Sequence, residues 1–410
     1  MIWPILKPIY SPNSDMKLRL FITLILLSLP LVANGQAAQL SDQAEISLIT
    51  ILPGETPEEL FGHSAVRVND PANNIDISYN YGTFHFDDYF LLKFIYGDLE
   101  YFLSEAPFPL TVRHYRERQR PMYEQVLNLT QQQKQDLHEF LIVNIQEENR
   151  YYQYDFLYDN CSTRIQDALE DVLGDDLRFH YTEGEERTFR ELIHLYADPD
   201  SFNGLGIDLL LGSTIDIRAT SRQHMFLPDF LMMEFDNATV LVDGEMQPLV
   251  ATTTQPLQLD DYEQNPGRPI ALIFTWILFI AGAIVTFFQI RKNRYVNLWL
   301  DLPLFGTIGL IGLLIVFLWF FSLHTETVRN LNLFWAWPFH LLILPFLIKR
   351  TTKNGVMSIY FTLYAAVCLL ILAGWWFWTQ QLNSAIIPIL LLLSLRAGCN
   401  AYSLLPKNWR

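Results

Sequence analysis

The residue best suited to covalent chemistry is Cys161, the only cysteine outside the hydrophobic C-terminal part of the chain. After it, apolar residues recur with the spacing of one helical face, at Ile165, Ala168, Leu169, Val172 and Leu173. Asp159 or Asn160 is suited to cap the start of this helix, and Gly174 to end it. A thiol on the first turn of a helix lies near free N–H groups, which favour the nucleophilic thiolate. The alternative is a small, buried apolar residue.

A histidine that could serve this thiol is His63, in the stretch Phe61-Gly62-His63-Ser64-Ala65. One cysteine with a distant histidine is typical of a nucleophile pair in which the histidine accepts the thiol proton. Three residues on or near the next predicted strand are candidates to orient the imidazole, namely Asn80, Asp76 and His85. We favour Asn80, although a sheet-edge side chain bonded to the backbone explains it equally well.

Two further polar residues flank Cys161. Asn160 is better explained as a capping residue than as a catalytic one, and the N–H of Cys161 is the natural oxyanion donor. Arg164 lies one helical turn beyond Cys161 and could contact a phosphate. We favour an ion pair with Asp155 or Asp167 for it.

The elements that must position these residues follow from local patterns. Alternating or continuous apolar runs predict strands at 45–52, 64–68, 75–81 and 121–129. Helices are expected at 87–96 and, after a Thr130 cap, up to about residue 149. Residues 175–228 are expected to form a loop-rich cover over the site, and residues 251–268 a linker to the membrane. Together, residues 36–250 are expected to form an α+β catalytic domain.

The N-terminus resembles an export signal. Lys17 and Arg19 precede the apolar run 20–32, and Ala33-Asn34-Gly35 is a small-x-small cleavage site. We expect a signal peptide at 16–35, with residues 1–15 upstream of the true start. An uncleaved anchor is the alternative, although the run is short for a span.

Five apolar stretches follow Arg268, at about 269–290, 296–321, 331–348, 355–378 and 385–403. Each is close to the roughly 20 residues that cross a bilayer as a helix. Basic residues concentrate in the first and third connections and in the tail 404–410, which places these parts in the cytoplasm. The acidic domain then lies on the outer side, where an export signal would also send it. Arg396, inside a predicted span, is expected to snorkel to the cytoplasmic side.

The charge is unevenly distributed along the 410 residues. Residues 36–267 hold 14 Lys and Arg against 41 Asp and Glu, whereas residues 268–410 hold 11 against 2. This pattern argues against a nucleic-acid partner and suits an extracytoplasmic domain on a membrane anchor. The acidic domain would tend to be repelled by an anionic surface. The three cysteines imply no disulfide framework, and the scattered histidines imply neither a metal site nor a cofactor.

In the outer connection, His324, Glu326 and Arg329 are candidates for contact with lipid headgroups, and Asn330 and Asn332 are further candidates for the lipid or membrane side. An outer loop needs polar residues in any case. Six tyrosines near the site either pack in the core or line an acyl channel, and these are Tyr79, Tyr81, Tyr151, Tyr152, Tyr154 and Tyr158.

Histidine before cysteine, with the cysteine opening a helix, resembles a circular permutation of the papain-like order, as in LRAT-type acyltransferases and NlpC-like cysteine hydrolases. More specifically, the chain resembles the family with the Lnb-type N-terminal periplasmic domain. The residues that carry this resemblance are Phe61 to Ala65, Tyr79 to Phe84, and Tyr154 to Arg164. In the membrane region, His324, Asn330, Asn332 and Pro338 add to it.

The resemblance implies a permuted papain-like α+β domain followed by five transmembrane helices in a bacterial inner membrane. It also implies lipoprotein N-acylation, with a phospholipid as acyl donor and a diacylated lipoprotein as acceptor. Cys161 would form an acyl-thioester and His63 would transfer the protons. Two alternatives stay open. One is a cysteine hydrolase of lipid ester or cell-wall peptide, and the other is a non-catalytic envelope scaffold in which Cys161 is structural.

Overall fold

The computed structural model describes residues 38–181, 186–348 and 354–405. The expected signal peptide and its cleavage site lie outside the described residues, as do residues 406–410 of the expected tail.

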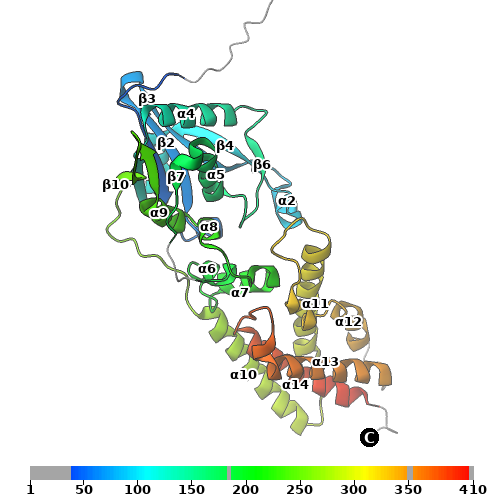
Figure 1. Ribbon diagram of the computed structural model, residues 1–410. Coiled ribbons are helices and arrows are strands. Elements are labelled where there is room, and N and C mark those ends of the chain that lie inside the picture. The colour runs from blue at the N-terminus through cyan, green and yellow to red at the C-terminus, as the bar shows by residue number, and fades with distance from the viewer. Residues whose placement is uncertain (1–37, 182–185, 349–353, 406–410) are drawn as a thin grey trace, which may run out of the picture. The chain divides into compact units, whose positions relative to one another are not determined.

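A seven-stranded antiparallel sheet forms the centre of the N-terminal half, in the order β10-β5-β1-β2-β3-β4-β6 (Figure 1). Its strands are β1 (Glu45–Ile51), β2 (His63–Asp70), β3 (Ile75–Phe84), β4 (Glu100–Pro107), β5 (Met122–Leu127), β6 (Tyr151–Gln153) and β10 (Val250–Leu257). Leu48 of β1 lies opposite Val66 of β2, so their side chains share one face. The register between β3 and β4 shifts after Asn80, which marks a bulge beside the candidate site.

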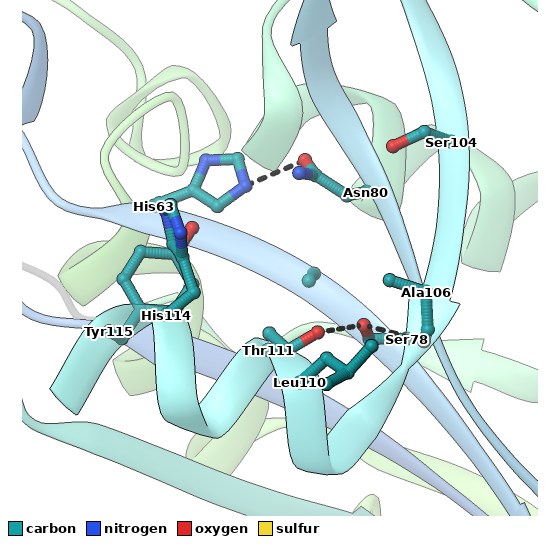
Figure 2. A pocket seen from close by; sticks show the side chains of 10 residues that line it. His63, Ser78, Asn80, Ser104, Ala106, Leu110, Thr111, His114 and Tyr115 are labelled. Carbon is teal, nitrogen blue, oxygen red and sulfur yellow. Dashed lines mark hydrogen bonds between the residues drawn. The ribbon is translucent and has the colours of Figure 1, made fainter. Parts of the chain in front are cut away.

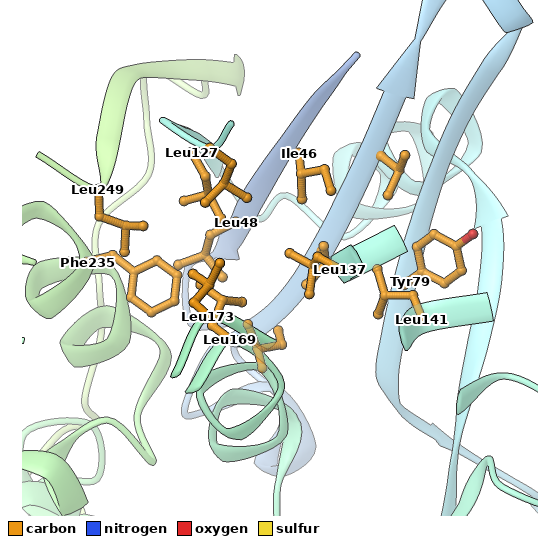
Figure 3. Packing of buried hydrophobic residues seen from close by; sticks show 14 of the residues in the cluster. Ile46, Leu48, Tyr79, Leu127, Leu137, Leu141, Leu169, Leu173, Phe235 and Leu249 are labelled. Atoms are coloured by element: carbon orange, nitrogen blue, oxygen red, sulfur yellow. The ribbon is translucent and has the colours of Figure 1, made fainter. Parts of the chain in front are cut away.

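One face of the sheet is covered by α4 (Gln131–Asn144), α5 (Cys161–Leu173) and α9 (Pro228–Asn237). Figure 3 shows the core between them, to which strands, helices and the bend before β10 contribute Ile46, Leu48, Tyr79, Leu127, Leu137, Leu141, Leu169, Leu173, Phe235 and Leu249. Truncating one of the buried leucines to alanine typically costs about 2–5 kcal/mol. This packing holds α5, and with it Cys161, against the sheet.

The starts of α4 and α5 lie at the predicted capping residues. Thr130 and Gln133 form a reciprocal capping box at α4. Asn160 and Thr163 form another at α5, which ends at Gly174. Each box satisfies two of the backbone N–H groups that a helix start leaves unpaired. The register of α5 is therefore set at the residue before the thiol.

The other face is covered by α3 (Phe108–Glu117), from which Phe108 and Tyr115 pack against Ile49 and Ala65. Neither α3 nor β4 is predicted from the sequence, although Pro109 in the first turn is a usable helix-start signal. The expected helix at 87–96 is present as α2 (Phe90–Tyr96), between β3 and β4.

The cover at 175–228 contains more regular structure than expected. It holds β7 (Leu177–Arg178), α6 (Phe189–His194), α7 (Phe202–Leu210), η4 (Ser213–Ile215) and α8 (Ser221–His224). A hairpin of β8 (Thr239–Val242) and β9 (Glu245–Pro248) joins β7 in a second sheet. Its turn, Asp243-Gly244, has two positive φ angles, as a two-residue hairpin turn requires. Short 3₁₀ turns are η1 (Pro57–Glu59), η2 (Pro71–Asn73), η3 (Gly174–Asp176), η5 (Leu331–Phe334) and η6 (Trp375–Phe377).

The linker predicted at 251–268 is wrong over its first half. Residues 250–257 form β10, which pairs with β5 at the edge of the main sheet. The Thr-rich composition of this segment suggested a loop, but β-branched residues are also good strand formers on an exposed edge.

Among the described residues, four helices are long and apolar enough to cross a bilayer, namely α10 (Ile270–Arg291), α11 (Leu298–Phe320), α13 (Gly355–Ala373) and α14 (Ile386–Leu404). The stretch at 331–348 was expected to be a fifth, but within the described residues it forms η5, an irregular turn and the nine-residue α12 (His340–Ile348). Pro338 disfavours helix at the residue before it, and Pro345 lies inside α12. Five regular transmembrane helices are therefore not found in the described residues.

Arg396 does not snorkel. It is fully buried, and its guanidinium donates to both oxygens of Asp301 on α11, at 2.7 and 2.9 Å. It also donates to the Thr286 hydroxyl of α10 at 3.0 Å. A charge with a complete set of partners can stay in an apolar bundle, so this residue joins three helices instead of reaching for water.

A second buried cluster, here called the Asp208 cluster, joins the cover to the connections that precede α12 and α14. Arg190 donates to Asp208 at 2.6 Å and, through two nitrogens, to Asp216 at 2.8 and 2.9 Å. His194 and Asn383 complete the Asp208 carboxylate at 3.0 and 2.8 Å. All the oxygens of this carboxylate are used, as a buried ion pair requires.

Candidate active site

His63 and Asn80 face each other across neighbouring strands, where β2 begins and β3 bulges. Figure 2 shows the imidazole pointing at the amide, with His63 Nε2 2.8 Å from Asn80 Oδ1. Of the three residues proposed to orient the imidazole, the favoured one is therefore the one in hydrogen-bond contact.

The hydrogen bonds also assign the tautomer of His63. Asn80 Oδ1 accepts the N–H of Gly82 at 2.7 Å, so the oxygen of this amide, and not its NH₂, lies at that position. His63 Nε2 must then carry the proton that it donates to the same oxygen. In the neutral ring the other nitrogen, Nδ1, is left as a base.

Two glycines make room for this arrangement. A side chain at Gly82 would place its Cβ 2.5 Å from His63 Cε1 and 3.2 Å from Asn80 Oδ1. Gly62 has φ +79°, and a Cβ there would lie 2.9 Å from the Ile51 carbonyl oxygen. Both positions therefore need glycine, because any larger residue would displace the imidazole or the start of β2.

Cys161 is the first residue of α5, and its side chain is half-buried. The Asn160 side chain accepts the N–H groups of Ser162 and Thr163 at 2.8 and 3.1 Å, so this cap does not use the N–H of Cys161. The Asn160 NH₂ group donates to the carbonyls of Phe156 and Phe226. Asn160 is thus a structural residue, as favoured from the sequence.

A pair of buried serines ties the thiol-bearing turn to the histidine strand. Ser162 Oγ lies 2.9 Å from Ser64 Oγ on β2 and 4.0 Å from Cys161 Sγ. Because Ser64 and Ser162 are the immediate neighbours of His63 and Cys161, this contact holds the start of α5 against the start of β2. Sequence reasoning missed it, although the serine beside each candidate residue was a usable signal.

The surroundings of Cys161 favour the thiolate. Burial alone would raise the pKa of the Cys161 thiol, but the charge and hydrogen bond of His63 outweigh it. The N–H of Ser64 and the hydroxyl of Ser162 act in the same direction, so the pKa of the thiol lies below its ordinary value. Cys161 is therefore expected to form a thiolate more readily than an ordinary cysteine.

A cavity of about 310 Å³ adjoins the imidazole on the α3 side of the sheet (Figure 2). Its lining combines the two site residues with apolar and hydroxyl groups, including Ala65, Ala106, Leu110, Ser78 and Thr111. Cys161 is not among the lining residues, so the cavity reaches the site from the histidine side.

Three sequence candidates have other roles. Asp76 pairs with Arg67 at 2.7 Å, and the His85 ring stacks on Phe102 at a centroid distance of 4.7 Å. Arg164 pairs with Asp159, not with Asp155 or Asp167 as expected. The Asp155 carboxylate instead accepts the N–H groups of Leu157 and Tyr158, and Asp167 pairs with Arg222.

The candidates in the outer connection divide into two groups. Asn330 and Asn332 are fully buried, and their amides donate to backbone carbonyls of Leu209 and Asp208, so they do not face lipid. Arg329 is exposed. His324 Nε2 lies 2.7 Å from the Phe94 carbonyl oxygen of α2.

Within the described residues, no group of three or more His, Cys, Asp or Glu side chains is placed to hold a metal ion.

Comparison with known proteins adds the family. The model of the Lnb N-terminal periplasmic domain matches residues 35–194, and that of the Lnb transmembrane domain matches residues 263–408. Searches of curated proteins and of solved structures each found no match. The matched periplasmic domain contains the His63 and Cys161 site, and the matched membrane domain contains all four candidate spans. The chain thus belongs to the Lnb family of multi-pass inner-membrane proteins with a periplasmic domain.

Proposed function

We propose that this protein is a thiol-dependent lipoprotein N-acyltransferase. It would move a fatty acyl chain from a phospholipid to the N-terminal amine of a diacylated lipoprotein. The observation that carries the proposal is the geometry of His63. Its Nε2–H donates to Asn80, which leaves Nδ1 as a base. His63 also lowers the pKa of the Cys161 thiol. The order of a strand histidine before a helix-opening cysteine also suits the permuted papain-like fold.

In the first step, the Cys161 thiolate attacks the ester carbonyl of the phospholipid. The C–S bond forms, and the C–O bond to the glycerol breaks. The imidazolium of His63 returns its proton to the leaving alkoxide, which departs as a lysophospholipid. The N–H of Cys161, at the start of α5, is the proposed donor to the oxyanion.

In the second step, the amine of the lipoprotein attacks the acyl-thioester. His63 takes a proton from the attacking nitrogen, the C–N bond forms, and the C–S bond breaks to regenerate the thiolate. An amine attacks a thioester more readily than an oxygen ester, so the covalent intermediate lowers the barrier to amide formation.

The proposed topology places the periplasmic domain outside and the C-terminus in the cytoplasm. Asn330, after α11, and Asn383, before α14, both donate to residues 199–209 of the periplasmic half. The two connections therefore lie on the same side as that domain. α13 lies between these two connections in the sequence. If α13 spans the membrane, the chain must also cross it once between Asn330 and α13, and the short α12 would form part of that crossing. The basic residues at 291–294 and 349–353 favour the inner side for the other connections.

The test is intact-mass analysis of the full-length protein incubated with phospholipid, with and without a diacylated lipopeptide. The expected result is a fatty-acyl adduct on Cys161 that is absent in Cys161→Ser and transfers to the lipopeptide amine. An adduct that transfers only to water would instead establish the cysteine hydrolase of lipid ester. If no lipid gives an adduct, the transferase is excluded and the scaffold becomes the better account.

A further inference from the structure

An apolar segment between β3 and β4 has no cover in the described structure. Within residues 86–96, which include α2, the exposed fractions of Phe86, Leu91 and Leu92 are 81%, 66% and 65%. Tyr89, Phe94 and Tyr96 are exposed as well. The surfaces of soluble proteins rarely expose so many large apolar side chains in one place, and such patches usually mark an interaction site.

This segment is attached to the outer end of a membrane span. The N–H of Leu323, three residues beyond α11, donates to the Tyr96 carbonyl at 2.7 Å, and His324 Nε2 lies 2.7 Å from the Phe94 carbonyl oxygen. At that end of α11, Phe320 and Phe321 are also exposed. The apolar surface of the span therefore continues onto α2.

The chemistry of the segment suits a membrane interface. Phenylalanine, tyrosine and leucine are typical of residues inserted at the boundary between headgroups and acyl chains. The one cation of α2, Lys93, is exposed and pairs with Asp87 at 2.7 Å. The long side chain of Lys93 can keep this pair at the headgroup level while the helix lies deeper.

Aromatic rings connect this segment with the active site. Centroid distances are 6.1 Å from Phe94 to Phe90, 5.0 Å from Phe90 to Phe84 and 5.0 Å from Phe84 to Tyr101. Tyr101 stacks on Tyr154 at 4.3 Å. Tyr101, Tyr154 and Cys161 pack against the same buried apolar cluster, so the run of rings ends at the part of the core that also holds the thiol.

We propose that residues 86–96 insert into the outer leaflet of the membrane and that the rings from Phe94 to Tyr101 guide an acyl chain from the leaflet to Cys161. The insertion depends only on the surface and its contact with α11, whereas the guiding role rests on the proposed function. The proposal also explains how a strongly acidic domain can approach a lipid surface. The segment that makes contact is mainly apolar. Its two carboxylates, Asp87 and Asp88, precede α2, and most acidic residues of the domain lie outside the segment.

Insertion is tested by the depth of a nitroxide label in the full-length protein, reconstituted in phospholipid nanodiscs. The label is attached at Leu92→Cys in a Cys161→Ser background, where the other two cysteines are buried. Val143 is a matched control, because it is 53% exposed but lies on α4, outside the segment 86–96. We expect oxygen to reach position 92 far more readily than a water-soluble nickel complex, and the reverse at Val143→Cys. Equal access of the nickel complex to both positions would exclude insertion.

The guiding role is tested with Leu91→Asp/Leu92→Asp, a change confined to exposed side chains. With bilayer phospholipid as donor, we expect acylation of Cys161 to slow by about tenfold or more, whereas acylation by soluble p-nitrophenyl butyrate stays unchanged. Equal loss with both esters, or no loss with phospholipid, would overturn the guiding role. If the unmodified protein is never acylated by phospholipid, the proposed function fails and the guiding role with it, but the label depth still decides insertion.

Discussion

The His63 site and the Asp208 cluster are both polar groups in largely buried surroundings, but they differ in what they leave unused. In the Asp208 cluster, the carboxylate oxygens accept from Arg190, His194 and Asn383. At the candidate active site, Asn80 holds one nitrogen of His63 and leaves the other free to act as a base, and Cys161 is only half-buried. The first arrangement is complete, whereas the second keeps capacity for a substrate.

This difference shows that the density of polar contacts does not identify a functional site. A fully satisfied cluster stabilises the position of the elements around it. A cluster with a defined tautomer, a lowered thiol pKa and an open approach can do chemistry. The two clusters should therefore respond to mutation in opposite ways.

The largest effect is expected for His63→Ala. Removing the base should slow acylation of Cys161 by about 10²–10⁴-fold, which is the usual contribution of a general base. The half-buried imidazole contributes little to the core, so the melting temperature should stay close to that of the unmodified protein. Mass-spectrometric time courses of the acyl adduct give the rate. An unchanged rate would mean that His63 is not the base.

Asp208→Ala is expected to lower the stability of the protein and to leave the reactivity of Cys161 unchanged. Arg190 would keep Asp216 but lose one partner in a buried site, and breaking such a pair typically costs about 3–5 kcal/mol. Denaturant unfolding in detergent measures this loss, while the alkylation rate of Cys161 in the folded fraction should not change. Arg113→Ala breaks an exposed pair with Glu117 and serves as control, with an expected change below about 1 kcal/mol. Equal stability of the two variants would contradict the assigned role of the cluster.

The local signals explain why the site was more predictable than the cluster. The helix that begins at Cys161 follows from its apolar spacing and its Asn160 cap, which involve residues within one or two turns. Asn80 was favoured because a strand beside His63 brings its residues within reach. Asp208 and Arg190 lie 18 residues apart and Asn383 is 175 residues from Asp208, so nothing local in the sequence indicates that they meet.

An intermediate effect is expected for Asn80→Ala, which frees the imidazole without removing it. The pKa of the Cys161 thiol is lowered by His63, so the thiolate persists to lower pH than in an ordinary cysteine. Loosening His63 should raise this pKa, because the imidazole then stabilises the thiolate less well. The pH profile of iodoacetamide alkylation measures it. The buried Cys368 and Cys399 should stay unreactive in both proteins, and identical profiles would show that Asn80 does not position the imidazole.

The smallest effect is expected for Glu326→Gln. Glu326 lies between α11 and η5, and its carboxyl interacts with that of Asp155 in the loop before α5. Burial, and then the charge of Asp155, raises the pKa of Glu326 to about 7. A raised pKa means that the folded state binds the proton more tightly, so this stabilisation is complete below about pH 4.5 and is lost as the pH rises through 7. The melting temperature should therefore fall more between pH 5 and 8 in the unmodified protein than in Glu326→Gln, by about 2–4 °C. If the melting temperatures of the two proteins changed in parallel with pH, the raised pKa of Glu326 would be contradicted.

Errors in the predicted fold also arose where distant contacts outweigh local composition. Thr252, Thr253 and Thr254 suggested a linker but pair with β5. Arg164 has three acidic residues within reach along the sequence, and only the three-dimensional path of the loop selects Asp159. Arg396 was expected to seek water because its partner, Asp301, lies on another helix.

The position of β10 has a practical consequence for isolating the periplasmic domain. A chain cut at residue 250, the boundary expected from the sequence, would lack the partner of β5 from Met122 to Leu127. The freed backbone groups of β5 would then be available to pair with a second molecule, which is a common route to aggregation. Leu257, buried beside Ile49, would be missing from the core as well. A soluble fragment should therefore extend beyond Leu257, because the last strand of the periplasmic domain is also the start of the path into the membrane.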